Sequence, residues 1–311
     1  MMKRMRKLLG SGFLLSLLLL TAGCGGSAPA ADTNGDMTVV TSFYPMYVLT
    51  LNVTAGIDGV NVVNMAQPQT GCLHDYQLST ADLKVLDAAD VLVVNGAGME
   101  SFLDKIVEEM PAVQVVTASD GMELLADEHE MHVEEHEVNP HVWVSPSGAA
   151  QEVRNIAAGL MAADPAHAEA YAANGEAYAA QLEALAAEMK EGLSPLASRK
   201  IVTFHEAFPY FAQEFGFEIA AVVESEPGQE PVAKEIDALI QTMQQEEIPA
   251  IFVESQYADT TARLVAEETG AGIYELDLVV TGDTDAPAEE VRGSYEAAMR
   301  TNLEVLTEAL Q

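Results

Sequence analysis

The histidines and one aspartate of this chain stand at positions where metal chemistry is expected. His205 and Asp277 each come directly after an apolar segment that reads as a strand, and His74 follows another such segment by one turn. In open α/β sheets, ligands bind beyond the carboxyl ends of the strands, where loops from distant parts of the sequence converge. Together with His141, these residues would supply three imidazoles and one carboxylate. Such a mixed nitrogen and oxygen set suits zinc, and suits manganese less well.

Three further histidines, His129, His132 and His136, lie among glutamates in the polar segment 120–139, which reads as a loop. Exposed imidazoles and carboxylates of this kind could form a weak accessory metal site. The alternative is a solvated, disordered acidic loop without a role in binding. The sequence leaves both interpretations open.

Carboxylates close to the candidate ligands are candidates for a supporting role. A ligand imidazole needs its second nitrogen held by a carboxylate, a carbonyl or a water molecule. Asp75, Glu206 and Glu254 stand beside candidate ligands or at a strand end, and Glu254 could alternatively replace Asp277 as the anionic ligand. Trp143 is expected to pack against a wall of the site.

Cys72 lies two residues before His74, so its thiolate could approach the same metal. A thiolate ligand would favour zinc over manganese further. The alternative is a small buried apolar side chain in a tight turn after Gly71, which is how unpaired cysteine most often behaves.

The amino terminus has the three parts of an export signal: four basic residues within the first seven, an apolar run over 8–20, and small residues before Cys24. The apolar run is shorter than the roughly 20 residues that a membrane-spanning helix needs. Leu-Thr-Ala-Gly-Cys resembles a lipobox, so we expect a signal peptide over 1–23, a lipid on Cys24 and a tether over 24–36. An uncleaved anchor helix is the alternative.

The chain has 311 residues, of which 49% are hydrophobic, so the mature part can bury the cores of two domains. Without the basic amino terminus, 10 basic residues remain against 49 acidic ones. This charge argues against nucleic acid and anionic lipid as partners and favours cations. With Cys24 lipidated, Cys72 has no partner for an internal disulfide.

Apolar strands alternate with helical patterns in both halves of the chain, which predicts parallel sheets covered on both faces. We expect strands at 37–42, 61–66, 90–95, 112–117, 200–204, 219–223, 250–254 and 272–276. We expect helices at 46–55, 79–87, 100–109, 164–192, 209–215, 233–246, 260–269 and 287–309.

The helix expected over 164–192 is unusually long, with Gly175 in its first half. The simplest architecture is therefore two Rossmann-like lobes joined by one long rigid helix, with the metal cleft between the lobes. We expect the boundaries to be an amino-terminal lobe over 37–163, the linking helix over 164–195, and a carboxyl-terminal lobe over 196–311.

Several motifs, in order, resemble the metal-binding lipoproteins of the zinc and manganese ABC importers, the ZnuA-like and TroA-like cluster A-I. They are TSFYPMY, HDYQLSTADLKVLDAADVLVVNGAGMESFLDKI, NPHVWVSP, FHEAFPYFAQEFG and IPAIFVESQYADTTARLVAEETGAGIYELD, which cover nearly the whole mature chain. The resemblance implies that the ligands are His74, His141, His205 and Asp277. It also implies an extracytoplasmic, membrane-anchored monomer that hands its metal to an ABC permease and its ATPase.

The resemblance also bears on which metal is carried. A histidine at the third ligand position is the pattern associated with zinc, whereas the manganese members more often have glutamate there, so manganese is the alternative. The chain departs from the family where Cys72-Leu73 and Gln77-Leu78 replace the usual proline and Glu-Pro.

Three other functions compete with metal transport. A zinc hydrolase would use Glu206 or Glu254 as general base, but no H-E-x-x-H motif is present. A closed shell of four ligands also leaves no position for the water of a catalytic zinc, so we expect binding without turnover. An additional role as an adhesin or surface metal reservoir stays open. A binding protein for an organic ligand would need a more aromatic cleft than 6% of aromatic residues suggests.

Overall fold

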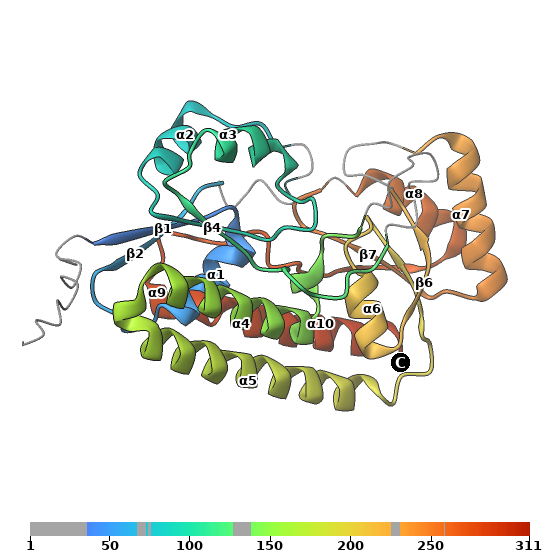
Figure 1. The fold of residues 1–311 in the computed structure, drawn as a ribbon. Coiled ribbons are helices and arrows are strands. Elements are labelled where there is room, and N and C mark those ends of the chain that lie inside the picture. The colour runs from blue at the N-terminus through green and yellow to red at the C-terminus, as the bar shows by residue number, and fades with distance from the viewer. Residues whose placement is uncertain (1–35, 67–72, 74–75, 127–137, 225–230, 258) are drawn as a thin grey trace, which may run out of the picture. The chain divides into compact units, whose positions relative to one another are not determined.

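The computed structural model describes residues 36–66, 73, 76–126, 138–224, 231–257 and 259–311. Within these ranges the chain forms two four-stranded sheets, ordered β2-β1-β3-β4 and β6-β5-β7-β8, with every strand pair parallel (Figure 1). The strands are β1 (Met37–Thr41), β2 (Val60–Asn64), β3 (Val91–Val94), β4 (Gln114–Thr117), β5 (Lys200–Thr203), β6 (Glu218–Val222), β7 (Ala250–Val253) and β8 (Gly272–Glu275). The two parallel sheets predicted from the sequence are confirmed.

The helices connect successive strands and continue to the carboxyl terminus. They are α1 (Tyr44–Val53), α2 (Thr80–Asp87), α3 (Asp104–Glu108), α4 (Pro146–Ala163), α5 (Ala168–Leu193), α6 (Pro209–Phe215), α7 (Ala233–Glu246), α8 (Thr260–Thr269), α9 (Ala288–Arg292) and α10 (Ser294–Ala309). The described ranges also contain the short 3-10 turns η2 (Ser101–Leu103), η3 (Val142–Val144) and η4 (Pro165–His167). No helix of the described residues is long and apolar enough to cross a membrane.

The sheets share one topology, and that topology determines which loops meet. In each sheet the first strand lies between the second and the third, so the order reverses between β1 and β3 and again between β5 and β7. Loops that leave such neighbouring strands diverge and open a crevice at the carboxyl edge of the sheet. The central strands β3 and β7 are buried along their whole length, as their continuous apolar sequences predict.

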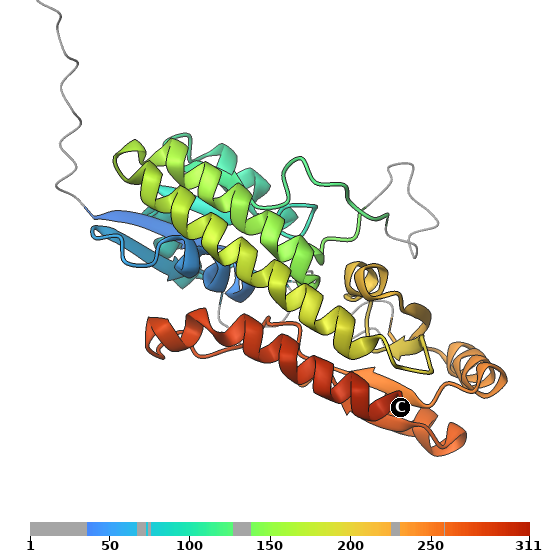
Figure 2. The same cartoon turned by 90° about the horizontal axis from the view of Figure 1, so that it is seen from below.

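The long helix predicted over 164–192 is confirmed as α5, whose predicted apolar face is buried at Tyr171, Tyr178, Leu182 and Leu185. Its first turn is η4 rather than α-helix. Figure 2 shows α5 running beside α4. The two helices approach so closely at Gly175 that a Cβ there would lie 2.6 Å from the Cβ of Ala157. The glycine is therefore required by packing.

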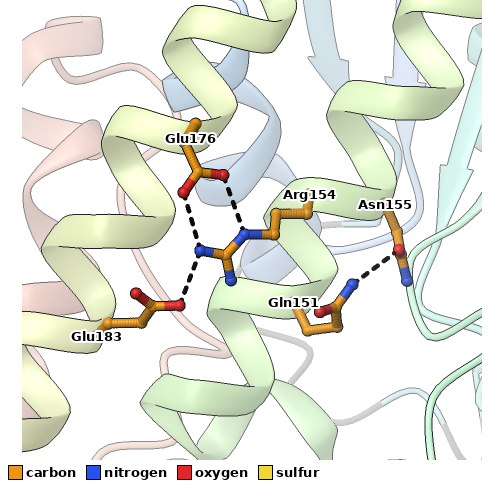
Figure 3. Close-up of polar contacts among 5 residues, drawn as sticks. All are labelled: Gln151, Arg154, Asn155, Glu176 and Glu183. Carbon is orange, nitrogen blue, oxygen red and sulfur yellow. Dashed lines mark hydrogen bonds and ion pairs between the residues drawn. The ribbon is translucent and has the colours of Figure 1, made fainter.

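A cluster of charges also joins α4 to α5 on their outer face (Figure 3). The Arg154 guanidinium on α4 donates to both carboxylate oxygens of Glu176, at 3.1 and 3.2 Å, and lies 2.8 Å from Glu183. These hydrogen bonds hold the pKa of Arg154 above its ordinary value and that of Glu176 below it. Because both carboxylates are exposed and the guanidinium is only half-buried, these ion pairs add little stability.

Three helix predictions need correction. Helix α4 was not expected, although Ser145 and Pro146 are ordinary start residues: the Ser145 Oγ accepts the Gly148 N–H at 3.1 Å. The helix expected over 100–109 is shorter, with η2 before α3, because the chain first turns through positive φ angles over 96–98. The helix expected over 287–309 is divided at Gly293 into α9 and α10.

Candidate metal centre

Two of the predicted ligands lie side by side in the interior. The rings of His141 and His205 have centroids 5.4 Å apart and meet edge to face. Both side chains are buried, with 2% and 1% of their surfaces exposed. His141 comes just before η3, and His205 follows β5, so two residues far apart in sequence lie side by side.

Asn139 fixes the orientation of His141. The Asn139 Oδ1 accepts the backbone N–H of His141 at 3.0 Å and lies 3.2 Å from its Nδ1. The other end of the same amide, Nδ2, donates to the backbone oxygen of Glu206 at 2.8 Å, which settles which atom of the amide is oxygen. An amide oxygen only accepts, so Nδ1 carries the proton and the ring lone pair lies on Nε2.

Glu254 lies beside the ring of His205, as Asn139 lies beside that of His141. The Nδ1 of His205 lies 2.7 Å from Oε2 of Glu254, and both residues are buried. A carboxylate oxygen is an acceptor, so this close contact favours a ring orientation with Nδ1 towards Glu254. The contact follows from the topology, because His205 follows β5 and Glu254 follows β7, the two strands between which the order reverses. A supporting role of Glu254 for His205 therefore stays a prediction, with this contact as its geometric basis.

Asp277 follows β8 and is exposed to solvent. The Asp277 Oδ1 accepts the Val279 N–H at 2.7 Å, while the Asn302 side chain bonds both backbone groups of Asp277 at 2.8 Å. The protein packed around the carboxyl raises the pKa of Asp277, an effect that the Val279 hydrogen bond opposes. The connection of Asp277 to the histidines runs through its neighbour Leu278, whose oxygen accepts the Trp143 indole N–H at 2.9 Å.

Aromatic side chains enclose the two imidazoles. The Trp143 ring is fully buried with its centroid 5.2 Å from that of His141, and the Tyr257 ring is 5.5 Å from His205 and stacks on Phe204. Trp143 therefore packs beside the site as expected. By keeping bulk water away from the imidazoles, these rings strengthen the attraction between the ring nitrogens and a bound cation.

Several predicted residues fall outside the described part of the chain: His74, Cys72 and Asp75, the accessory histidines His129, His132 and His136, and Cys24. Among the described residues, no group of three or more histidine, cysteine or acidic side chains is placed to hold a metal ion. The described part thus brings two of the candidate ligands together, His141 and His205, and does not group Asp277 with them. Glu206 is half-buried and contributes its backbone oxygen to the contact with Asn139.

Sequence reasoning missed three residues that hold the candidate ligands: Asn139, Asn302 and Tyr210. The Tyr210 hydroxyl donates to the backbone oxygen of Asn139 at 2.8 Å and accepts the Leu125 N–H at 2.9 Å. Asn139 stood in the quoted motif NPHVWVSP, two residues before His141, so its place in the sequence was a usable signal. The sequence around Asn302 and around Tyr210 contains no motif that indicates this role.

Chemically, the pair fits a transition metal ion. Each of the two imidazoles has its Nδ1 beside an acceptor, and a neutral ring in that orientation presents Nε2 as a ligand atom, which is the usual arrangement around zinc. The amide and carboxylate partners also prevent the rings from turning.

Comparisons with known proteins agree with this chemistry. The profile of the family described as "Zinc-uptake complex component A periplasmic" matches residues 39–309. The high-affinity zinc uptake system protein ZnuA of Bacillus subtilis (strain 168) is 30% identical over 98% of both chains. The iron-binding protein YfeA of Yersinia pestis is 31% identical over 84% of both. A crystal structure of ZnuA superposes with a TM-score of 0.76 at 26% identity, covering 88% of this chain and 99% of the other.

Proposed function

Because the chain belongs to the family of the zinc-uptake complex component A, we propose that it captures Zn²⁺ outside the cytoplasm and delivers it to an ABC importer. The supporting observation is the buried pair His141 and His205, each with its Nδ1 held by an acceptor. Members of the family are periplasmic components of uptake systems, so the chain's role is to bind and hand over a substrate.

The proposed ligands are His74, His141, His205 and Asp277. The resemblance of the sequence motifs supports His74, and the position of Asp277 after β8 supports the carboxylate. Four protein ligands would complete a tetrahedral zinc site and leave no position for a reactive water, so we propose binding without catalysis. Manganese, or iron as in the name of one relative, is the alternative cargo, but a set of three imidazoles favours zinc.

We propose the same anchoring and partners as the sequence predicts. A lipid on Cys24 would hold the monomer at the membrane beside an ABC permease and its ATPase, with 24–36 as a tether. The proposed division is signal peptide 1–23, amino-terminal lobe 37–163, linking helix 164–195 and carboxyl-terminal lobe 196–311. Cys72 as an additional ligand, and a weak accessory site at His129, His132 and His136, remain subordinate proposals.

Zinc titration of histidine variants tests the proposal. His141→Ala and His205→Ala each remove one nitrogen ligand and should lower zinc affinity at least 100-fold, measured by competition with a chromophoric chelator. His167→Ala is the matched control, because His167 lies at the start of α5 and contacts Asp164. Unchanged zinc affinity in both site variants, or failure of the unaltered protein to bind zinc, would refute the proposal.

A further inference from the structure

The outer edge of the amino-terminal sheet is an open strand. In the order β2-β1-β3-β4, strand β4 is last, so within the described part of the chain it is paired on one side only. The Gln114 N–H donates to the Asp90 oxygen at 3.1 Å, on the side of β3. Because the backbone direction alternates along a strand, the N–H groups of Val115 and Thr117 point away from β3.

The backbone groups on this open side are available to another chain. No other described residue bonds the N–H or the oxygen of Val115 on that side, and 38% of Val115 is exposed. The Thr117 oxygen accepts the Asp120 N–H at 3.3 Å in a turn, which leaves the Thr117 N–H. An extended peptide alongside β4 can therefore make three backbone hydrogen bonds, and open strand edges commonly bind other chains in this way.

Two hollows flank this edge, one on each face of the sheet. In Figure 1, α3 lies above β4 and α4 below it. The hollow on the α3 side has a volume of 510 Å³, and the hollow on the α4 side has a volume of 250 Å³. Val115 and Thr117 border both hollows, so the strand edge separates them. Successive side chains of an added strand point to opposite faces, so each would enter one of the hollows.

The larger hollow suits a long basic side chain. Val94, Val107 and Val115 line it with methyl groups, and the exposed Asp104 and Glu108 of α3 line it with carboxylates. An arginine or a lysine can lay its aliphatic stem on the valines and place its charge beside the carboxylates. No basic residue of the described ranges lines either hollow, so nothing there repels such a charge.

The smaller hollow suits a short side chain. It is bordered by the exposed Asp120 and by Asn155, Ala158 and Gly159 of α4. The acidic residues around both hollows argue against a second copy of this chain as the occupant. Two β4 edges brought together would place these carboxylates against one another, in chains that each have a net charge of −35.

We propose that the edge of β4 is a docking site for an extended, basic segment of another protein. The segment adds a strand to the sheet and places an arginine or a lysine in the hollow beside Asp104 and Glu108. Backbone hydrogen bonds supply the attraction, and the two hollows determine which side chains are accepted. The site uses no candidate metal ligand, so this function is additional to metal capture.

NMR of the chain without its signal peptide tests the site. The probe is a six-residue peptide, capped at both ends, in which arginine alternates with valine. The amide signals of Val115 and Thr117 should shift when it is added. With the peptide at about ten times its dissociation constant, hydrogen exchange of these two amides should slow about tenfold. Unchanged signals and exchange at Val115 and Thr117 would overturn the inference.

A second peptide separates strand addition from general attraction to an acidic protein. It has the same sequence, but every backbone nitrogen is methylated, so it keeps the charge and cannot donate backbone hydrogen bonds. It should bind at least tenfold more weakly. Equal binding of the two peptides would mean that charge alone attracts them, and would contradict the proposed docking site.

Charge variants test the larger hollow. Asp104→Asn with Glu108→Gln removes both carboxylates and should weaken binding of the first peptide about fivefold, as expected for two exposed ion pairs. Glu304→Gln with Glu308→Gln is the matched control, because these exposed residues have the same spacing on α10. The control should leave peptide binding unchanged, and an equal loss in both double variants would argue against a site at β4.

Val115→Pro tests the strand edge itself. Proline removes the N–H that points away from β3, while the bonds between β4 and β3 involve the neighbouring residues. The variant should lose binding of the first peptide, and undiminished binding would refute strand addition. If the variant does not fold, the methylated peptide makes the same test on the unaltered protein.

Discussion

The two candidate ligand imidazoles are held by different acceptors, an amide at His141 and a carboxylate at His205. A carboxylate beside one ring nitrogen increases the basicity of the nitrogen on the opposite side of the ring more than an uncharged amide does. His205 is therefore expected to be the stronger zinc ligand of the pair. This difference depends on Glu254, which is buried beside the ring.

Replacing Glu254 with Gln tests that difference. The variant keeps the shape of the side chain but loses its charge, so the His205 ring is less firmly oriented and its Nε2 is less basic. Zinc affinity should fall at least tenfold, within the range seen for such partners of metal-binding histidines. Chelator competition measures it. Glu246→Gln, which alters only a surface ion pair with Lys200, should leave zinc affinity unchanged, and an equal loss in both variants would contradict the idea.

Glu152 gives a second prediction at this scale, about stability. Its side chain is fully buried on α4, and neither carboxylate oxygen has a hydrogen-bond partner among the described residues. Burial, and then repulsion from Glu100, raise the pKa of Glu152 well above its ordinary value. The folded protein therefore holds a proton that the unfolded chain releases near its ordinary pKa of about 4.3, and stability must fall as the pH rises from there towards the folded pKa.

Glu152→Gln removes this dependence. The free energy of unfolding of the variant, relative to the unaltered protein, should increase as the pH is raised, by up to about 1.4 kcal/mol per pH unit within that window. Urea unfolding at a series of pH values measures the difference. A difference that stays constant with pH would show that Glu152 titrates normally. The same difference in unfolding free energy, measured for Glu176→Gln, should decrease as the pH is raised, because Arg154 holds the pKa of Glu176 below its ordinary value.

The meeting of His141 and His205 could be predicted from the sequence, because strand ends and imidazoles are both visible in it. The asparagine side chains that hold the candidate ligands could not be predicted in this way. Asn139 contacts Glu206 across 67 residues and Asn302 contacts Asp277 across 25, and an uncharged amide carries no mark of its partner. Their roles depend on distances that exist only after the chain has folded.

Helices and strands of this chain differ in how far local sequence determines them. The strands were predictable within a residue or two because apolar runs mark them. The start of α4 at Ser145-Pro146 was also marked, but the break between α9 and α10 was not. Gly293 has a φ of −86°, which any residue can adopt, and the break is accompanied by a bond from Ser294 Oγ to the Val291 oxygen.

The close approach of α4 and α5 makes Gly175→Ala a test at this scale. Alanine favours helix by about 1 kcal/mol over glycine. However, the Cβ of the new alanine would lie 2.6 Å from the Cβ of Ala157. Neither methyl group can rotate away from the other, so the helices must separate. Overpacking of this kind costs about 1–3 kcal/mol, so the variant should unfold at lower urea concentration.

The double variant Gly175→Ala with Ala157→Gly supplies the control for that prediction. It removes the clashing atom while leaving the total propensity of the two helices unchanged. Its stability should return close to that of the original protein, and the two changes should be strongly non-additive. If Gly175→Ala alone stabilises the protein, the spacing of α4 and α5 described above is wrong.

Over the whole molecule, the segment 139–145 is bonded to the carboxyl-terminal half of the chain although it precedes α4. Asn139 donates to the Glu206 oxygen, Ser145 donates to Glu214 at 2.5 Å, and Trp143 is bonded on both sides. Its indole N–H donates to Leu278, and its backbone oxygen accepts the Tyr295 hydroxyl at 2.7 Å. The loop of His141 is therefore fixed to the parts of the chain that carry His205 and Asp277, which favours small movements during metal release.

Trp143→Phe tests whether this attachment governs release. Phenylalanine fills most of the same buried space but cannot donate to the buried Leu278, so that oxygen loses its partner at a cost of about 1–3 kcal/mol. Because the same bond connects the segments of His141 and Asp277, zinc should also dissociate several-fold faster in stopped-flow chelator experiments. Tyr178→Phe is the matched control, since it removes a single bond between α5 and Glu296 on α10. It should lower stability without changing the zinc dissociation rate, and equal acceleration in both variants would mean that release follows overall stability rather than the contact of Trp143.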